Sequence, residues 1–176
     1  MRALILVLLL PAAVSGAASF ATYCTPSGRV DQVVLNRVGR SRIEVRLATY
    51  SFDWPELGTL LAAKKRQGVS VRVLCDGRRG ETEVAGLEEM SRVETGPGRF
   101  HAKLAVLDRK TVLVGSVNLT SSGIYLHHND LLEVEDARIA EFCCRVFDAW
   151  WSGDVPPARL RTAEMDIYLS PGEDLA

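Results

Sequence analysis

Residues 101–118 read HAKLAVLDRKTVLVGSVN, and this stretch decides the fold that we expect for the chain. Two short runs rich in β-forming residues, 102–107 and 111–114, lie on either side of the polar residues 108–110. Apolar side chains alternate through the first run, as they do in a strand with two covered faces. The stretch therefore predicts an antiparallel hairpin.

Four polar side chains near the open end of this hairpin suit phosphate chemistry. Side chains two positions apart share a face of a strand. His101 and Lys103 are thus expected on one face of the first strand, and Ser116 and Asn118 on one face of the second. An ammonium neutralises phosphoryl oxygens, a hydroxyl and an amide donate hydrogen bonds, and an imidazole can act as nucleophile or as general acid and base. The set contains no carboxylate cluster of the kind that holds Mg²⁺, and it predicts neither a metal nor a cofactor.

The spacing extends to two further residues, Asp108 and Gly115, and reads H-x-K-x4-D-x6-G-S-x-N. This pattern resembles the signature of the phospholipase D superfamily. The resemblance runs from roughly Val30 to Trp151, and its layout is similar to the small secreted bacterial endonucleases and to the mitochondrial cardiolipin hydrolase/Zucchini branch. It implies an α/β fold in which a mixed β-sheet is flanked by helices, with one motif per chain.

The resemblance also implies a mechanism. The active site of the superfamily is built from two such motifs, and this chain has one, so we expect a homodimer with the site on its two-fold axis. One His101 would attack phosphorus to form a phosphohistidine, and the partner's His101 would protonate the leaving oxygen. Lys103, Asn118 and Ser116 would hold the non-bridging oxygens. Asp108 is expected in the catalytic set, supporting the hairpin or Lys103.

One position departs from the superfamily pattern. Members usually carry an acidic residue about eleven positions after the asparagine of the motif, where it orients the histidine. Asn129 occupies that position here, and Asp130 follows it. Asp130 serves if the loop is one residue longer, or Asn129 substitutes through its amide. A third alternative is that residues 127–130 form a solvated loop.

Residues 1–22 are expected to be a signal peptide or an N-terminal membrane anchor. An apolar run follows Arg2, and small residues lie at 15–18, which favours export with cleavage near Ala17. The alternative is an uncleaved anchor, because no charge occurs between Arg2 and Arg29. Both interpretations predict an exported or membrane-anchored protein.

The phospholipase D-like domain is expected to span residues 23–152, followed by a polar tail at 153–176. The length suits one such domain, and 47% hydrophobic residues suffice for a core. Asp53 and Asp136 are predicted to cap helices, because a carboxylate accepts the free N–H groups of a first turn. The expected helices cover about 30–38, 53–66 and 137–151, and further strands cover about 41–51, 69–73 and 131–134.

The four cysteines, Cys24, Cys75, Cys143 and Cys144, are compatible with an oxidising compartment. Their pairing cannot be deduced from the sequence, and buried free thiols are an equal alternative. Their spacing matches no zinc site.

The substrate is the least defined feature. The formal net charge is −1, so no global basic field favours nucleic acid. A local basic patch of Arg78, Arg79 and Arg99 is expected to bind substrate beside His101. Three hypotheses stand: a metal-independent nuclease acting on DNA or RNA, a lipid hydrolase acting on cardiolipin or another phospholipid, and a non-catalytic dimer that binds nucleic acid. The intact His101 and Lys103 argue against the third.

Overall fold

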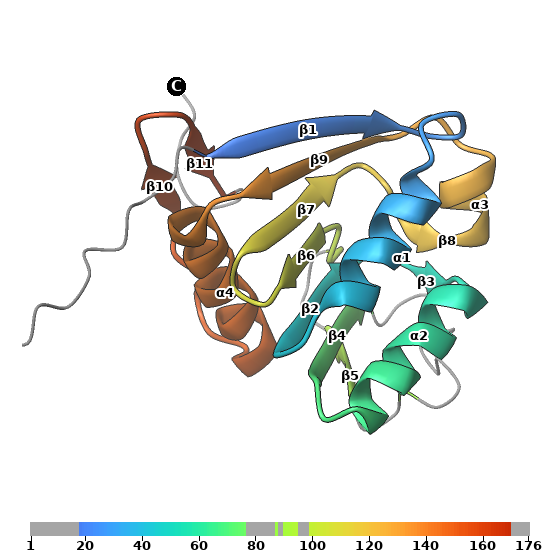
Figure 1. Ribbon diagram of the computed structural model, residues 1–176. Helices are drawn as coiled ribbons and strands as arrows, with labels where there is room; N and C mark the ends of the chain where they lie inside the picture. The colour runs from blue at the N-terminus through green and yellow to red at the C-terminus, as the bar shows by residue number, and fades with distance from the viewer. Residues whose placement is uncertain (1–17, 77–86, 88–89, 95–98, 170–176) are drawn as a thin grey trace, which may run out of the picture.

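The computed structural model describes residues 18–76, 87, 90–94 and 99–169 (Figure 1). Its centre is a seven-stranded sheet with the strand order β1-β9-β7-β6-β2-β4-β5. These strands are β1 (Ser19–Cys24), β2 (Glu44–Thr49), β4 (Ser70–Asp76), β5 (Ser91–Glu94), β6 (Lys103–Leu107), β7 (Thr111–Gly115) and β9 (Asp130–Glu135). β2, β4 and β5 are parallel, whereas each neighbouring pair from β2 through β6, β7 and β9 to β1 is antiparallel. The predicted mixed sheet is confirmed.

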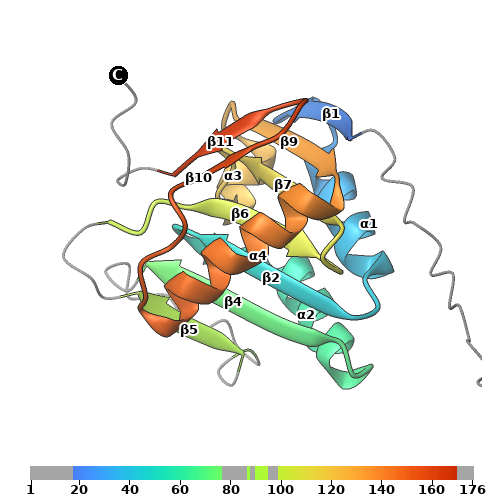
Figure 2. The same cartoon turned by 90° about the vertical axis from the view of Figure 1, so that its left-hand side faces the viewer.

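Helices cover both faces of this sheet. α1 (Val30–Arg40) and α2 (Pro55–Arg66) lie on one face, and α4 (Ala137–Ser152) lies on the other (Figure 2). Because alternate residues of a strand point to opposite faces, β2 contributes to both apolar clusters. Leu47 packs with the α1 and α2 side, and Ala48 packs with the α4 side. Within the described part of the chain, no helix combines the length and apolar character needed to cross a bilayer.

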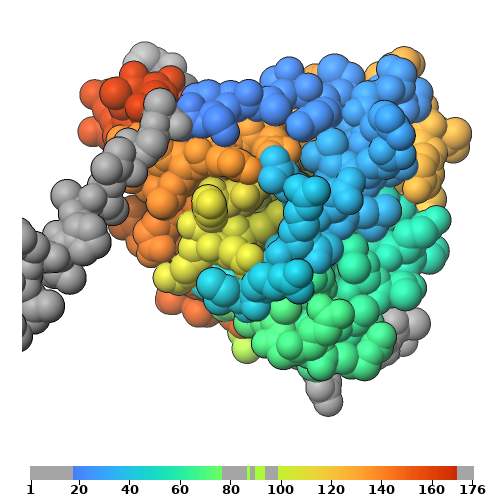
Figure 3. Space-filling model, viewed as in Figure 1, coloured from blue at the N-terminus to red at the C-terminus, as the bar shows by residue number. Residues whose placement is uncertain are grey.

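The predicted hairpin is confirmed as β6 and β7. Its register pairs Leu104 with Val114 and Leu107 with Thr111. The connecting loop, residues 108–110, surfaces between α1 and α4 in the space-filling view (Figure 3). The hairpin therefore runs from this loop to the opposite edge of the sheet, where His101 precedes β6 and Asn118 follows β7.

The two predicted helix caps have different outcomes. Asp136 caps α4, since its carboxylate accepts the N–H groups of Arg138 at 2.8 Å and Ile139 at 3.1 Å. The prediction for Asp53 is wrong. The N-cap of α2 is Trp54, which makes no side-chain capping bond. Asp53 instead ends a short strand and lies one residue before the N-cap, where strand pairing keeps its backbone extended.

That strand is β3 (Phe52–Asp53), which pairs in parallel with β8 (Leu119–Thr120). The next element after β8 is the short helix α3 (Ser121–Tyr125), and the Ser121 hydroxyl donates to the backbone oxygen of Asp53 at 3.1 Å. Figure 1 shows β8 and α3 beyond the end of β7. This small sheet therefore ties the chain that follows the hairpin to the chain that follows β2.

Both ends of the described chain contribute structure beyond the expected segments. β1 begins at Ser19, within the segment expected to be a leader, and pairs with β9 from Ser19 opposite Glu135 to Cys24 opposite Asp130. Residues expected to be a polar tail form a hairpin of β10 (Arg159–Arg161) and β11 (Asp166–Tyr168). Leu160 and Ile167 alternate with polar residues in these strands, so both apolar side chains point to one face, which packs against the cluster under α4.

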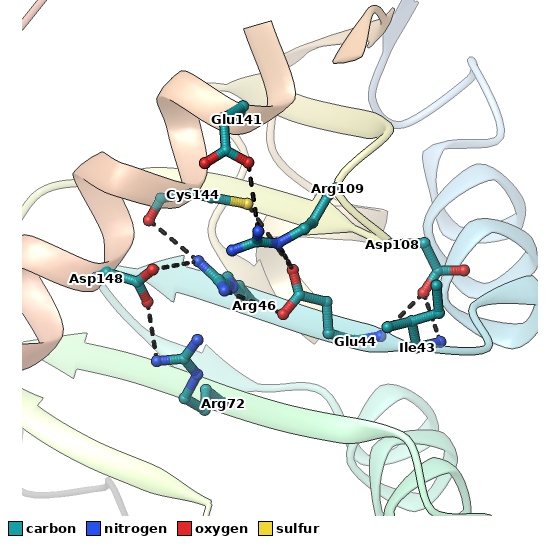
Figure 4. A network of polar contacts seen from close by, with 9 residues as sticks. All are labelled: Ile43, Glu44, Arg46, Arg72, Asp108, Arg109, Glu141, Cys144 and Asp148. Carbon is teal, nitrogen blue, oxygen red and sulfur yellow. Dashed lines mark hydrogen bonds and ion pairs between the residues drawn. The ribbon is translucent and has the colours of Figure 1, made fainter. Parts of the chain in front are cut away.

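A line of ion pairs holds α4 on the sheet (Figure 4). Arg46 is only 3% exposed, and its guanidinium contacts Glu44 at 3.0 Å and Asp148 at 2.7 Å. Arg72 contacts the other oxygen of Asp148 at 2.9 Å, and Arg109 contacts Glu44 at 3.1 Å. Removing one partner of a buried pair leaves an uncompensated charge, so this network fixes where α4 lies.

The four cysteines are free thiols. Cys75 packs in the cluster under α1 and α2, whereas Cys143 and Cys144 pack in the cluster under α4. The sheet separates these two clusters, so Cys75 cannot reach either helix thiol. Burial raises the pKa of Cys75 and Cys143 to about 12, which keeps both thiols protonated and unreactive.

Candidate active site

His101 and Lys103 lie at the edge of the sheet where β6 begins. Lys103 opens β6 directly opposite Thr49, the last residue of β2. Its ammonium turns back and donates to the backbone oxygen of His101 at 3.0 Å. The two side chains expected on one face therefore belong to one local structure, which is anchored by the β2–β6 pairing.

Thr49 also brings the other half of the motif to this edge. The side chain of Thr49 is buried, and its hydroxyl accepts the Leu119 N–H at 3.4 Å while donating to the Ser51 oxygen at 2.9 Å. Because Asn118 precedes Leu119, this contact holds the asparagine beside the start of β6. Lys103 and Leu119 also line the same small apolar recess. Thr49 therefore links Lys103, its partner across the sheet, with the residue that follows Asn118.

Asn118 is half-buried, and the oxygen of its side chain has no hydrogen-bond partner among the described residues. Buried polar atoms are nearly always paired, and unpaired ones concentrate where a ligand completes the bonding. A carboxamide offers both a donor and an acceptor, whichever way it is turned. Asn118 therefore places at this edge a carboxamide whose buried oxygen has unused hydrogen-bonding capacity.

Ser116 ties the end of β7 to the start of β9. Its hydroxyl donates to the side-chain oxygen of Asn129 at 3.2 Å and accepts the Asp130 N–H at 3.0 Å. Gly115 allows this close approach, since a Cβ there would lie 2.0 Å from the Asp130 oxygen. Ser116 is exposed at the rim of the site, and its hydroxyl is already engaged by the protein.

Asn129 and Asp130, the two alternatives for orienting the histidine, both face other partners. The Asn129 amide donates to the Gly123 oxygen at 3.0 Å, and the Asp130 carboxylate accepts the Cys24 thiol at 3.3 Å. In residues 99–169 neither side chain is hydrogen-bonded to His101. Asn129 instead supports Ser116, and Asp130 joins β9 to β1.

Asp76 supports His101 from β4, which is separated from β6 by β2 in the sheet. It ends β4, is 1% exposed, and accepts the Phe100 N–H at 2.6 Å. This bond holds the residue directly before His101, and the negative charge favours the protonated imidazole. The sequence signal was an acidic residue closing the apolar run of β4, which the sequence analysis passed over.

The electrostatics favour a neutral imidazole at neutral pH. His101 is exposed as a whole residue, and desolvation by the groups packed around its ring is the largest cause that lowers its pKa below the ordinary value of 6.5; the charges of Lys103 and Arg99 add to it. Burial lowers the pKa of Lys103 to about 8. A neutral imidazole is the nucleophilic form, and it lies beside a lysine that is still mostly protonated at neutral pH.

Asp108 lies at the other end of β6, five residues from Lys103, which is a separation of about 16 Å along a strand. Its carboxylate accepts the backbone N–H groups of Arg42 and Ile43 at 2.8 Å and of Glu44 at 2.9 Å (Figure 4). Asp108, expected in the catalytic set as a support for the hairpin or for Lys103, lies away from His101 and clamps the hairpin loop to the start of β2.

The basic patch is described only at Arg99, which is exposed two residues before His101. Arg78 and Arg79 lie outside the described residues. No group of three histidine, cysteine or acidic side chains in the described ranges is arranged to hold a metal ion. Lys103 and Arg99 are therefore the cationic groups that the described structure offers next to His101.

Comparison with known proteins agrees with this geometry. A family model described as "Cardiolipin synthase, PLD-like domain" matches residues 34–151. A phospholipase D of Rickettsia felis is 26% identical over 126 residues, which cover 68% of this chain and 63% of the relative. A human mitochondrial cardiolipin hydrolase is 27% identical over 119 residues, which cover 63% of this chain and 46% of the relative.

Solved structures share the fold. Nuc from Salmonella typhimurium, a phospholipase D family member, superposes with a TM-score of 0.71 at 22% identity, covering 80% of this chain and 99% of that one. NucT from Helicobacter pylori superposes with a TM-score of 0.68 at 16% identity and the same coverage. The matched part spans less than two thirds of the curated relatives named above. By the family match over most of its length, the chain belongs to the phospholipase D-like domain family.

Proposed function

We propose that this protein is a metal-independent phosphodiesterase that hydrolyses DNA or RNA as a homodimer. The observation that carries the proposal is the combination at one sheet edge of a neutral His101, the ammonium of Lys103 and the carboxamide of Asn118, whose oxygen is unpaired among the described residues. These groups suit attack on a phosphodiester and stabilisation of its oxygens.

In the proposed reaction, a ring nitrogen of His101 attacks phosphorus and the bond to the leaving oxygen breaks. The partner's His101 gives its proton to that oxygen, which leaves as an alcohol. The same imidazole then takes a proton from water, and the resulting hydroxide displaces the first His101 from phosphorus. Lys103 and Asn118 hold the non-bridging oxygens through both steps. The enzyme returns to its starting protonation, so each cycle consumes one water.

The second imidazole is the reason for proposing a dimer. In the described part of the chain, no second imidazole contacts His101. His127 and His128 precede β9, and the His127 backbone oxygen accepts from the Thr25 hydroxyl at 2.5 Å, beside β1, which is three strands away from β6 in the sheet. A symmetric contact between two copies supplies the missing group as a second His101. Paired imidazoles would also titrate as a unit and share one proton at neutral pH.

A lipid substrate is the second candidate, and the names of the matched relatives favour it. A phospholipase D and a mitochondrial cardiolipin hydrolase are among them. The same chemistry would then act on a phospholipid headgroup. We also propose export, in which cleavage after Ala17 would leave β1 complete because that strand begins at Ser19.

Plasmid nicking in excess EDTA tests the proposal, with purified wild type compared with His101→Ala. The proposed nuclease predicts nicking by the wild type and none by the variant. Equal nicking by both proteins would refute the role of His101. If neither protein nicks, release of phosphatidic acid from cardiolipin vesicles by the wild type, but not by His101→Ala, would transfer the same mechanism to a lipid.

A further inference from the structure

The aromatic ring of Tyr50 contacts both reactive side chains of the site. Its centroid lies 5.0 Å from that of the His101 imidazole, with the two planes tilted by 55°. The ammonium nitrogen of Lys103 lies 5.4 Å from the same centroid. Tyr50 is half-buried and follows β2 directly. Neither the motif spacing nor the expected strand pattern indicated this contact.

The register of the sheet explains why Tyr50 reaches both residues. Thr49 pairs with Lys103 across the antiparallel strands β2 and β6. Tyr50, which follows Thr49, and His101, which comes shortly before Lys103, therefore lie at the same edge of the sheet. The Lys103 ammonium is then held between two groups, the face of the Tyr50 ring and the His101 backbone oxygen at 3.0 Å. Tyr50, just after β2, thus contacts both Lys103, the first residue of β6, and His101, two residues before it.

This contact restricts side chains that would otherwise move. Fixing a lysine stem costs rotamer entropy. A cation over an aromatic face recovers part of that cost, and more of it where water is excluded. The ring also lies against the imidazole, and desolvation is the main cause of the lowered pKa of His101. One aromatic side chain therefore affects both the position of Lys103 and the hydration of His101.

We propose that Tyr50 is a positioning residue, whose ring face holds the Lys103 ammonium and the His101 imidazole side by side for one phosphoryl group. The part of this proposal that concerns catalysis rests on the proposed phosphodiesterase function. The packing itself needs no substrate. The property that matters is the ring face, so phenylalanine should replace tyrosine and leucine should not.

Proton NMR titration tests the packing without any reaction. The chain has three histidines, and His101→Ala identifies the His101 signal. In Tyr50→Leu we expect the His101 midpoint to move up toward its ordinary value, because the covering ring is gone, and its ring-current shift to disappear. Tyr50→Phe should match the wild type. Tyr168→Leu, which removes a ring from the remote β10–β11 hairpin, is the matched control. A wild-type His101 titration in folded Tyr50→Leu would overturn the proposal.

Kinetics then test the consequence on whichever substrate the wild type hydrolyses. Tyr50→Leu should lower kcat by about 10- to 100-fold, the size of effect expected from misplacing a reacting group by about 1 Å. The acid limb of its kcat/KM profile should move to higher pH with the His101 midpoint. Tyr50→Phe should keep near wild-type kcat. A loss in Tyr50→Phe as large as in Tyr50→Leu would assign the role to the hydroxyl and refute the ring. If the wild type hydrolyses nothing, the proposed function fails, and the NMR result still decides the packing.

Discussion

Replacing Asp108 with alanine is expected to destabilise the protein while leaving its chemistry intact. Asp108 is the aspartate of the sequence motif, yet its carboxylate accepts three backbone N–H groups at the start of β2 and touches nothing at the His101 edge. Its φ of 51° lies in the left-handed region, which aspartate and asparagine tolerate better than alanine.

The size of the loss follows from these contacts. The N–H of Glu44 is partly buried, and losing a hydrogen bond from it to a charged group costs about 1.5–3 kcal/mol. Water can replace the bonds of the exposed Arg42 and Ile43, so these two add roughly 0.5 kcal/mol together. Alanine in the left-handed region adds about 1 kcal/mol. The expected total for Asp108→Ala is about 3–4.5 kcal/mol.

Asp108→Asn separates the terms, since asparagine tolerates the positive φ and keeps an acceptor oxygen. Its loss should be about 1 kcal/mol. In a domain of this size the melting temperature should fall by about 6–18 °C for alanine and 2–4 °C for asparagine.

Urea unfolding followed by circular dichroism measures the free energy, with the exposed Asp166→Ala as the control. Activity is assayed at a temperature where all variants are folded. A folded Asp108→Ala with wild-type stability, or with activity reduced about 100-fold or more, would refute the structural role and return Asp108 to the catalytic set.

Three further outcomes follow from the site. Because the pKa of Lys103 is lowered to about 8, its charge is lost as the pH rises through that value, and kcat/KM should fall on the alkaline side. Lys103→Arg stays charged, so it should move this alkaline limb of the profile to higher pH or remove it. Gly115→Ala should cost at least about 2 kcal/mol of stability in urea unfolding, since its Cβ would lie 2.0 Å from the Asp130 oxygen. In the control Gly153→Ala no atom lies within 4 Å of the new Cβ, so only the positive φ opposes the substitution. Asp76→Asn should lower the NMR-measured pKa of His101 further, because the carboxylate that favours its protonated form is removed; an unchanged pKa would exclude this electrostatic coupling.

Patterns local in the sequence predicted most of the fold. Alternating apolar residues with a polar interruption predicted the β6–β7 hairpin, and a carboxylate before an amphipathic run predicted the Asp136 cap. The same cap logic failed at Asp53, because β3 pairs with a strand more than sixty residues away and keeps Asp53 extended. The hairpin of β10 and β11 was missed for a related reason: its strands are only three residues long, too short to show a period.

The sequence pattern pointed to the reactive side chains of the candidate site, but not to the residues that support them. His101, Lys103 and Asn118 are close in sequence, and the hairpin brings them to one edge. Tyr50 and Asp76, in contrast, reach this edge through the pairing of β2 with β6 and of β2 with β4, which no local pattern encodes. The motif spacing also placed Asp108 with the catalytic residues, although a strand carries it to the opposite edge.

The central claim, that two copies of His101 act on one phosphate, is tested most directly with a mixed dimer. Wild-type and His101→Ala chains carrying different tags are co-expressed, and the heterodimer is isolated by both tags. A shared site predicts that this heterodimer loses activity by at least about 1,000-fold relative to the doubly tagged wild type, since a nucleophile and its acid partner act as a unit. A heterodimer that keeps about half of the wild-type activity, or a wild type that is active as a monomer, would contradict the account.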